Sequence, residues 1–201
     1  MRRQSIAIIA GGVDLLSGFQ PVSQGARLIR EGILTRFDDV VLLHYNYFFD
    51  LGRSLHRLNR HLRSCDPARL ILYGYSKGGE LMLKLSRMLD PAISVDLLLM
   101  IDTANGPWSR SIDRSVPLNV RHAVNVYQTK RSFPLMSSGA AAHAPNPAIV
   151  TNIDLTTPRS ALNPITHGNF QQVMAPFAIQ WINAVATSGS VETSEFNFDI
   201  Q

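Results

Sequence analysis

The stretch RLILYGYSKGGELMLKLSRML, residues 69–89, constrains the fold more strongly than any other part of the chain. The apolar run Leu70–Tyr73 lacks a helical period and is partly β-branched or aromatic, which is typical of a short buried strand. After it, leucine or methionine recurs at positions 81, 85, 88 and 89, which is the spacing of one face of an amphipathic helix. The chain is therefore predicted to pass from a strand to a helix with almost no loop between them.

Two glycines flank a serine at this predicted turn, in the order Gly74, Tyr75, Ser76, Lys77 and Gly78. A turn this tight is possible only where side chains are small, and it leaves the residue between the glycines strained. A G-x-S-x-G pattern between a strand and a helix indicates a nucleophile elbow, which presents the serine hydroxyl for attack. The alternative is a glycine-rich turn in which Ser76 only caps the helix.

Strand-like and helix-like segments alternate along the chain. The predicted strands are Ile6–Ala10, Val40–His44, Leu70–Tyr73, Val95–Ile101, 122–128 and 148–153, and the predicted helices are Gly25–Leu34, Leu51–Arg63, Lys77–Leu89 and Phe170–Val185. This order predicts one α/β domain, with a mostly parallel central sheet of about six strands and helices on both faces. We place the domain at residues 1–186, because one core suits a chain of 201 residues, and expect 187–201 to form a flexible tail.

The amino terminus, MRRQSIAIIAGGVDLLSG, imitates a signal peptide with two arginines before an apolar run. The run is short, Asp14 interrupts the apolar residues after it and no A-x-A cleavage site is present, so Ile6–Ala10 is interpreted as the first core strand. No apolar run approaches the roughly 18 residues of a membrane span. The single Cys65 cannot form an internal disulfide, which favours the cytoplasm, although export without a cleaved signal peptide stays open.

The net charge is +4, from 19 basic and 15 acidic residues, and the excess gathers in the predicted helix Leu51–Arg63. The leucines of this segment share one face, and Arg53, Arg57, Arg60 and Arg63 crowd the other. Such a face is either a solvated helix surface or a docking surface for an acidic partner or an anionic ligand. Nucleic acid is not expected, because no aromatic residues interleave with the arginines to stack on bases.

A serine hydroxyl becomes an effective nucleophile only when a base removes its proton and a third group orients that base. Among the six histidines, His167 is the best candidate for the base. It follows the last predicted strand and directly precedes the final helix, where it can reach over the edge of the sheet to Ser76. The other histidines lie inside predicted elements or, in the case of His143, in a long loop.

Two aspartates are candidates for the orienting acid. Asp102 ends the strand that follows the helix of Ser76, and Asp154 ends the last predicted strand, shortly before His167. An unpaired carboxylate at the end of a long buried strand is costly, so Asp102 needs a partner. Asp154 has an alternative role in the segment DLTTPRS, where it can start a turn by bonding to its own backbone. We therefore expect Asp102 to be the acid and keep Asp154 as the alternative.

An oxyanion hole completes such a site, formed by the amide after the serine and by an amide in the loop after an early strand. Lys77 supplies the first amide, and Gly12 or Val13, in the segment AGGVDLLSG, supplies the second. The alternative for this segment is an ordinary glycine turn. No metal or other cofactor is expected, because the sequence contains no cluster of histidine, cysteine and acidic residues with the spacing of metal ligands.

Two long connections, 102–119 and 129–147, follow predicted strand ends and are rich in glycine, proline and serine. Loops of this length are usually functional or disordered, and we interpret these two as walls of a substrate site. Their apolar lining would come from Trp108, Phe133, Leu135 and Met136. The alternative for each is an ordinary surface position.

With these residues in place, the chain from Ile6 to about Val185 resembles a compact α/β-hydrolase, whose order of serine, acid and histidine it matches. The segment LLMIDTANGP resembles the acid-bearing segment of the thioesterase domains of polyketide and peptide synthetases. The elbow GYSKGG resembles that of cutinases, in which the acid lies shortly before the histidine, as Asp154 does here. Cutinases carry disulfides, which this chain cannot form, and no substantial helical lid is present in the sequence.

The sequence thus predicts a serine hydrolase, an esterase, lipase or thioesterase that cleaves a carboxylic ester or thioester through an acyl-enzyme on Ser76. The triad residues cannot distinguish an ester from a thioester, because the two differ in the leaving group. The alternative is a protein that keeps this fold and elbow but works only in binding.

Overall fold

The computed structural model describes residues 3–12, 22–43, 51–130, 138–156 and 166–188. Strands and helices alternate through most of them, as the sequence predicts. The strands are β1 (Ser5–Ala10), β2 (Asp39–Leu43), β3 (Arg69–Tyr75), β4 (Leu97–Ile101), β5 (Ala123–Tyr127) and β6 (Val150–Asp154). The helices are α1 (Gln24–Ile33), α2 (Leu51–Cys65), α3 (Lys77–Met88) and α4 (Phe170–Ser188), with short 3₁₀ turns at Ser109–Ser111 and Pro147–Ile149.

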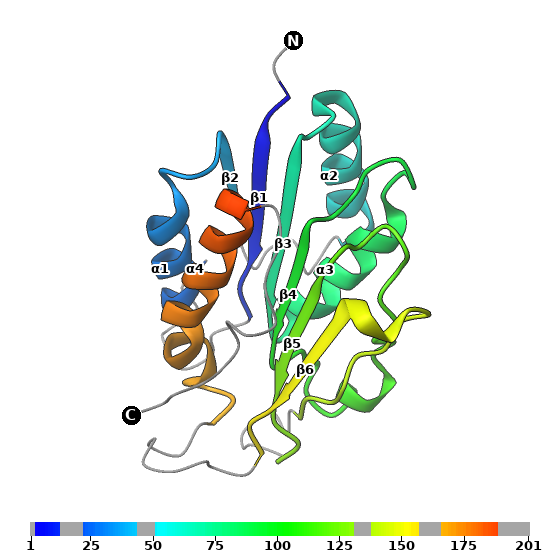
Figure 1. The fold of residues 1–201 in the computed structure, drawn as a ribbon. Coiled ribbons are helices and arrows are strands. Elements are labelled where there is room, and N and C mark those ends of the chain that lie inside the picture. The colour runs from blue at the N-terminus through cyan, green and yellow to red at the C-terminus, as the bar shows by residue number, and fades with distance from the viewer. Residues whose placement is uncertain (1–2, 13–21, 44–50, 131–137, 157–165, 189–201) are drawn as a thin grey trace.

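All six strands belong to one sheet, in the order β2-β1-β3-β4-β5-β6, and every neighbouring pair is parallel (Figure 1). The chain runs from β1 to β2 on one side and then crosses to β3 on the other side of β1. In open parallel sheets, ligands bind beyond the carboxyl ends of the strands at such a reversal of direction. Here the strands at the reversal, β1 and β3, end directly before Gly11 and Ser76.

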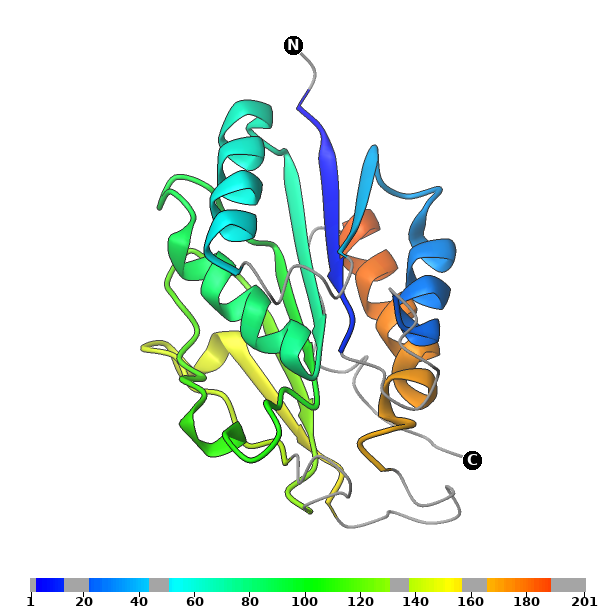
Figure 2. The same ribbon diagram turned by 180° about the vertical axis from the view of Figure 1, so that it is seen from behind.

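Helices cover both faces of the sheet, with α1 and α4 on one face and α2 and α3 on the other (Figures 1 and 2). Alternate side chains of a strand point to opposite faces, so each face receives its own apolar set. In β1, Ile6 and Ile8 pack with the core under α2 and α3, whereas Ala7 and Ile9 pack with the core under α1 and α4. This two-sided burial explains why the strands read as continuous apolar runs.

Most element ends agree with the sequence prediction within two residues, and β4 starts two residues later than predicted. The predicted strand Val95–Ile101 loses its first two residues, because Asp96 turns its carboxylate to the backbone N–H of Leu70 at 2.9 Å and to Arg121 at 3.0 Å. Val95 forms only an isolated bridge with Val120. The last strand is shifted to Val150–Asp154, because Pro147 begins a 3₁₀ turn instead of extending the strand.

Helix α4 continues past the predicted domain boundary at residue 186, through Thr187 and Ser188. Their hydroxyl groups donate to the carbonyls of Asn183 and Ala184 one turn earlier. The remainder of the predicted tail, 189–201, and the predicted strand end His44 lie outside the described residues. Among the helices that are described, none is long and apolar enough to cross a membrane.

Candidate active site

Ser76 occupies the sharp turn between β3 and α3, with φ 55° and ψ −122°. This left-handed backbone is rare for a residue with a side chain and is held by its surroundings. A Cβ atom on Gly74 would lie 2.4 Å from the carbonyl oxygen of Gly78, and one on Gly78 would lie 2.3 Å from the carbonyl oxygen of Ala10. Both contacts are with backbone, so the two glycines permit the close approach that the sequence pattern predicts.

The side chain of Ser76 faces His167, which lies shortly before the start of α4. Its Oγ lies 2.9 Å from Nε2 of His167, and Nδ1 of the same imidazole lies 2.7 Å from Oδ2 of Asp102. The carboxylate can only accept from Nδ1, which leaves Nε2 of the neutral ring free to accept from the serine hydroxyl. The structure therefore brings together the serine, histidine and aspartate that the sequence favours.

Asp102 is fully buried and adopts a left-handed backbone conformation, with φ 42°. Its carboxylate also accepts from Gln128, through the backbone N–H to Oδ1 and the side-chain amide to Oδ2, both at 3.3 Å. Gly139 packs so closely that a Cβ atom there would lie 2.7 Å from Oδ1 of Asp102. Because buried charge must be compensated by hydrogen bonds, these contacts fix the carboxylate in one orientation.

Tyr75, the residue before the serine, supports the histidine in two ways that the sequence did not predict. Its ring stacks on the imidazole of His167, with 5.4 Å between ring centroids and 27° between ring planes. Its hydroxyl donates a hydrogen bond to the backbone carbonyl of His167. The role of Gln128 was not predicted either. The sequence did offer one signal for it, because Gln128 is a polar residue at the end of the predicted strand that follows the strand of Asp102.

Two of the predicted oxyanion donors, Gly12 and Lys77, lie at the same edge of the sheet as Ser76. Gly12 packs against the elbow, since a Cβ atom on it would lie 2.8 Å from Cβ of Ser76. Lys77 follows Ser76 as the first residue of α3, where backbone N–H groups at a helix N-terminus carry partial positive charge. Val13 lies outside the described residues. Two of the three predicted donors thus lie beside Ser76.

Asp154, the alternative acid, has partners of its own at the end of β6. Its Oδ1 accepts from the backbone N–H of Thr156 at 2.8 Å and from the hydroxyl of the same residue. Burial raises the pKa of Tyr127, and the neighbouring carboxylate of Asp154 raises it further. The contacts with Thr156 form the local turn that the sequence offers as the alternative role of Asp154.

Trp108, a predicted wall of the substrate site, lies in the loop after β4 and is 67% exposed. The other three predicted wall residues, Phe133, Leu135 and Met136, lie outside the described residues. Cys65 ends α2 as a free, partly buried thiol. Within the described ranges, no group of three or more histidine, cysteine or acidic side chains is placed to hold a metal ion.

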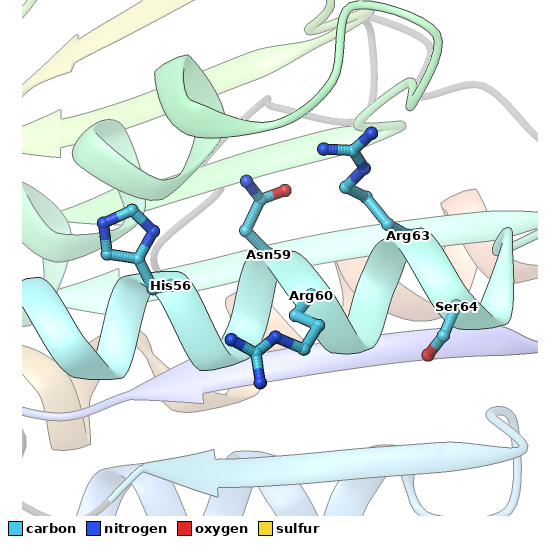
Figure 3. A pocket seen from close by; sticks show the side chains of 5 residues that line it. All are labelled: His56, Asn59, Arg60, Arg63 and Ser64. Atoms are coloured by element: carbon cyan, nitrogen blue, oxygen red, sulfur yellow. The ribbon is translucent and has the colours of Figure 1, made fainter.

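The arginines predicted to meet an acidic partner lie on α2, which contains four arginines and no acidic residue. The formal charge of this one helix, 4 − 0 = +4, equals that of the whole chain, 19 − 15 = +4. The helix lines a hollow of about 470 Å³ with His56, Asn59, Arg60, Arg63 and Ser64 (Figure 3). Arg63 is 3.6 Å from Asp90, so part of this charge is paired within the chain. An acidic partner at this face stays a prediction.

No protein family matches this sequence, and no curated protein matches it in sequence. Solved structures do match the fold. A presumed hydrolase of the alpha/beta superfamily from Xanthomonas campestris pv. campestris is 14% identical, with a TM-score of 0.50 and coverage of 90% of this chain and 99% of that chain. A presumed cell surface hydrolase from Lactobacillus plantarum WCFS1 is 10% identical, with a TM-score of 0.51 and coverage of 97% of this chain and 96% of that chain.

At these identities the comparison establishes the fold and nothing finer. The chain has the α/β-hydrolase fold, as the sequence predicts, with a six-stranded parallel sheet between two layers of helices. The narrower resemblances to thioesterase domains and cutinases stay predictions.

Proposed function

We propose that this chain is a serine hydrolase that cleaves a carboxylic ester or a thioester through an acyl-enzyme on Ser76. The observation that carries the proposal is the hydrogen-bonded chain from Ser76 Oγ to His167 Nε2, at 2.9 Å, and from His167 Nδ1 to Asp102 Oδ2, at 2.7 Å. Such a chain is the geometry by which a histidine accepts the proton of a serine hydroxyl while an aspartate holds its tautomer.

In the proposed reaction, Ser76 Oγ forms a bond to the acyl carbon while its proton passes to Nε2 of His167. The oxyanion that develops is stabilised by the amides of Lys77 and of Gly12 or Val13. The imidazolium then gives its proton to the departing alkoxide or thiolate as the bond to the acyl carbon breaks. A water molecule, activated by the same imidazole, hydrolyses the acyl-enzyme and restores the serine.

The burial of the three groups supports this assignment. Ser76 and His167 are 7% and 8% exposed, and Asp102 is fully buried. Charge that develops at a site shielded from water interacts more strongly with its partners than it would in bulk solvent. The strained residue of the elbow is the serine itself, and a strained backbone is often retained where it serves a function.

Reaction with a fluorophosphonate probe tests the proposal directly, because the probe bonds covalently to an activated serine. We expect labelling of the wild-type chain at Ser76 and none of Ser76→Ala, whose turnover of a short p-nitrophenyl ester should fall by at least about a thousandfold. Ser86→Ala is the matched control, since Ser86 is also buried, within α3, but its hydroxyl donates to the carbonyl of Leu83.

A wild-type chain that folds but takes no label, or Ser76→Ala activity within tenfold of the wild type, would contradict the proposal. The first result would favour a binding protein that keeps the fold without the chemistry, and the second would mean that Ser76 is not the nucleophile. If the wild-type chain is labelled at Ser76, parallel assays with an ester and a thioester of the same acyl group will show which of the two substrates it cleaves faster.

A further inference from the structure

Arg114 lies in the connection between β4 and β5 and is only 6% exposed. Among the described lysines and arginines, it is the one that is buried. One terminal nitrogen of its guanidinium donates to the carbonyl of Thr103 at 2.9 Å, and the other to the carbonyl of Ile112 at 3.3 Å. Its Nε is buried and has no hydrogen-bond partner among the described residues. A buried arginine with incomplete hydrogen bonding is costly and needs an explanation.

The bond to Thr103 connects Arg114 to the candidate acid, because Thr103 directly follows Asp102 in the chain. Asp102 has a left-handed backbone, and the carbonyl that Arg114 binds lies one residue further along the chain. On the other side, the N–H of Asp102 donates to the carbonyl of Val126 at 2.7 Å. Arg114 therefore holds the chain one residue after the strained position that carries the carboxylate, while the bond to Val126 holds the strained residue itself.

The charge of Arg114 reaches the same carboxylate. Burial lowers the pKa of the Arg114 guanidinium, and the negative charges of Asp102 and Glu80 act against that lowering. Arginine stays protonated in proteins, so it places a permanent positive charge near Asp102. Glu80 is itself paired with Lys84 at 2.6 Å, so its charge is partly balanced elsewhere.

We propose that Arg114 is a positioning residue of the proposed hydrolase: it holds the backbone after Asp102 through the carbonyl of Thr103 and keeps a fixed positive charge near Asp102. The inference rests on the proposed function, since it assigns Arg114 a part in the same reaction. Arg114 acts through Asp102 and does not touch the reacting atoms.

The fixed charge has a consequence for the pH dependence of the reaction. A fixed positive charge near Asp102 opposes the addition of a further proton to the site, so it should extend the reaction to lower pH. Among the described residues, Asp102 and Glu80 act on Arg114, Lys84 pairs with Glu80, and Tyr75 stacks on His167. Asp113, next to Arg114 in the chain, interacts with Arg87 and His143. Removal of the charge of Arg114 alone should therefore move the acid limb of kcat/KM to higher pH.

The experiment compares kcat/KM for a p-nitrophenyl ester between pH 5 and 9 in the wild type, Arg114→Met, Arg114→Gln and Arg114→Lys. The two neutral variants give two chances of a folded protein, since methionine suits a buried site and glutamine keeps a donor for Thr103. Arg110→Met is the matched control, because Arg110 lies exposed in the same connection. Circular dichroism and thermal melting establish that each variant is folded.

We expect the neutral variants to lose about tenfold to a hundredfold in kcat/KM, since a small misplacement of an orienting group has costs of this order. Their acid limb should move up by about half to one pH unit, whereas the lysine variant should keep the wild-type midpoint. The limb of Arg110→Met should not move. A merely structural role of Arg114 would lower the rate without moving the limb.

The two proposals fail in different ways. A wild-type chain that does not react with the fluorophosphonate probe contradicts the proposed function. A wild-type chain that does react, with a folded neutral variant whose acid limb stays at the wild-type midpoint, contradicts the assignment of Arg114 and leaves the hydrolase standing. A lysine variant that shifts as far as the neutral variants also contradicts it, because the charge would then have no effect.

Discussion

The substitution Asp102→Asn separates the two candidate acids, and the contacts of Asp102 predict how the variant rearranges. Asparagine has the same size, but one of its two carboxamide positions is an NH₂ group. At the position of Oδ1 this group would face the backbone N–H of Gln128, which can only donate. At the position of Oδ2 it would face His167 Nδ1 and the side-chain amide of Gln128, both of which can change to accept.

The NH₂ group of the variant is therefore expected at the position of Oδ2, with Nδ1 of His167 as acceptor. The proton of the imidazole then sits on Nε2, 2.9 Å from Ser76 Oγ, where no acceptor remains for the serine hydroxyl. A wrong tautomer of this kind costs on the order of ten thousandfold in turnover, or about 5 kcal/mol in activation free energy. The fold should persist, because size and most hydrogen bonds are kept.

The assay is kcat for a p-nitrophenyl ester near pH 8, with thermal melting as the measure of folding. Asp154→Asn is the paired variant, because the hydrogen bonds of its carboxylate to Thr156 belong to the local turn. It should stay within tenfold of the wild type in turnover and lose at most about 1 kcal/mol of stability. The reverse pattern, or an Asp102→Asn enzyme within tenfold of the wild type, would refute the assignment of Asp102.

Two further predictions concern Gly139, which packs against Asp102, and the buried Tyr73. A Cβ atom on Gly139 would meet Oδ1 of Asp102 at 2.7 Å, so Gly139→Ala should displace the carboxylate and lower kcat/KM by about tenfold or more. Gly52→Ala, whose Cβ meets nothing within 4 Å, should keep wild-type activity, and full activity of both variants would contradict the reasoning. Burial raises the pKa of Tyr73 far above its ordinary value of about 10, despite an opposing hydrogen bond from Gln171. The folded state thus holds the proton of Tyr73 more tightly than the unfolded state does. The protonated hydroxyl therefore stabilises the fold below about pH 10, and this stabilisation is lost by up to about 1.4 kcal/mol per pH unit as the pH rises further. Urea denaturation between pH 9 and 11 should show a shallower loss for Tyr73→Phe than for the wild type, and equal slopes would contradict this.

The fold could be predicted because its strands are buried on both faces and appear in the sequence as apolar runs. Several of these runs are followed by a helix with a clear apolar face, and that order leaves few topologies open. The predicted start of β4 was wrong because Asp96 satisfies a backbone donor of β3 with its side chain, a contact that depends on the neighbouring strand and leaves no pattern in the local sequence.

The partners of Ser76 could be ranked because the ends of parallel strands meet at one edge of the sheet. The same reasoning favoured Asp102, whose need for a partner follows from its burial. It could not find Arg114 or Tyr75, since their roles depend on which loop atoms lie nearest after folding. Both residues donate to backbone carbonyls, Arg114 to that of Thr103 and Tyr75 to that of His167. Every residue has such a carbonyl, so the sequence does not show which one is the acceptor.

The connections of the candidate site have a consequence for folding kinetics. The contacts of His167 with Ser76 and Asp102 join residues 91 and 65 positions apart, from the end of β3 to the start of α4. Contacts of such long range form slowly, because closing the intervening chain costs entropy before the contact compensates for it. A serine-directed probe added during refolding should therefore report the last docking event of the domain. Ser76 would start to react with the probe only after the circular dichroism signal of the helices has recovered. The time course of labelling would therefore measure when folding is complete.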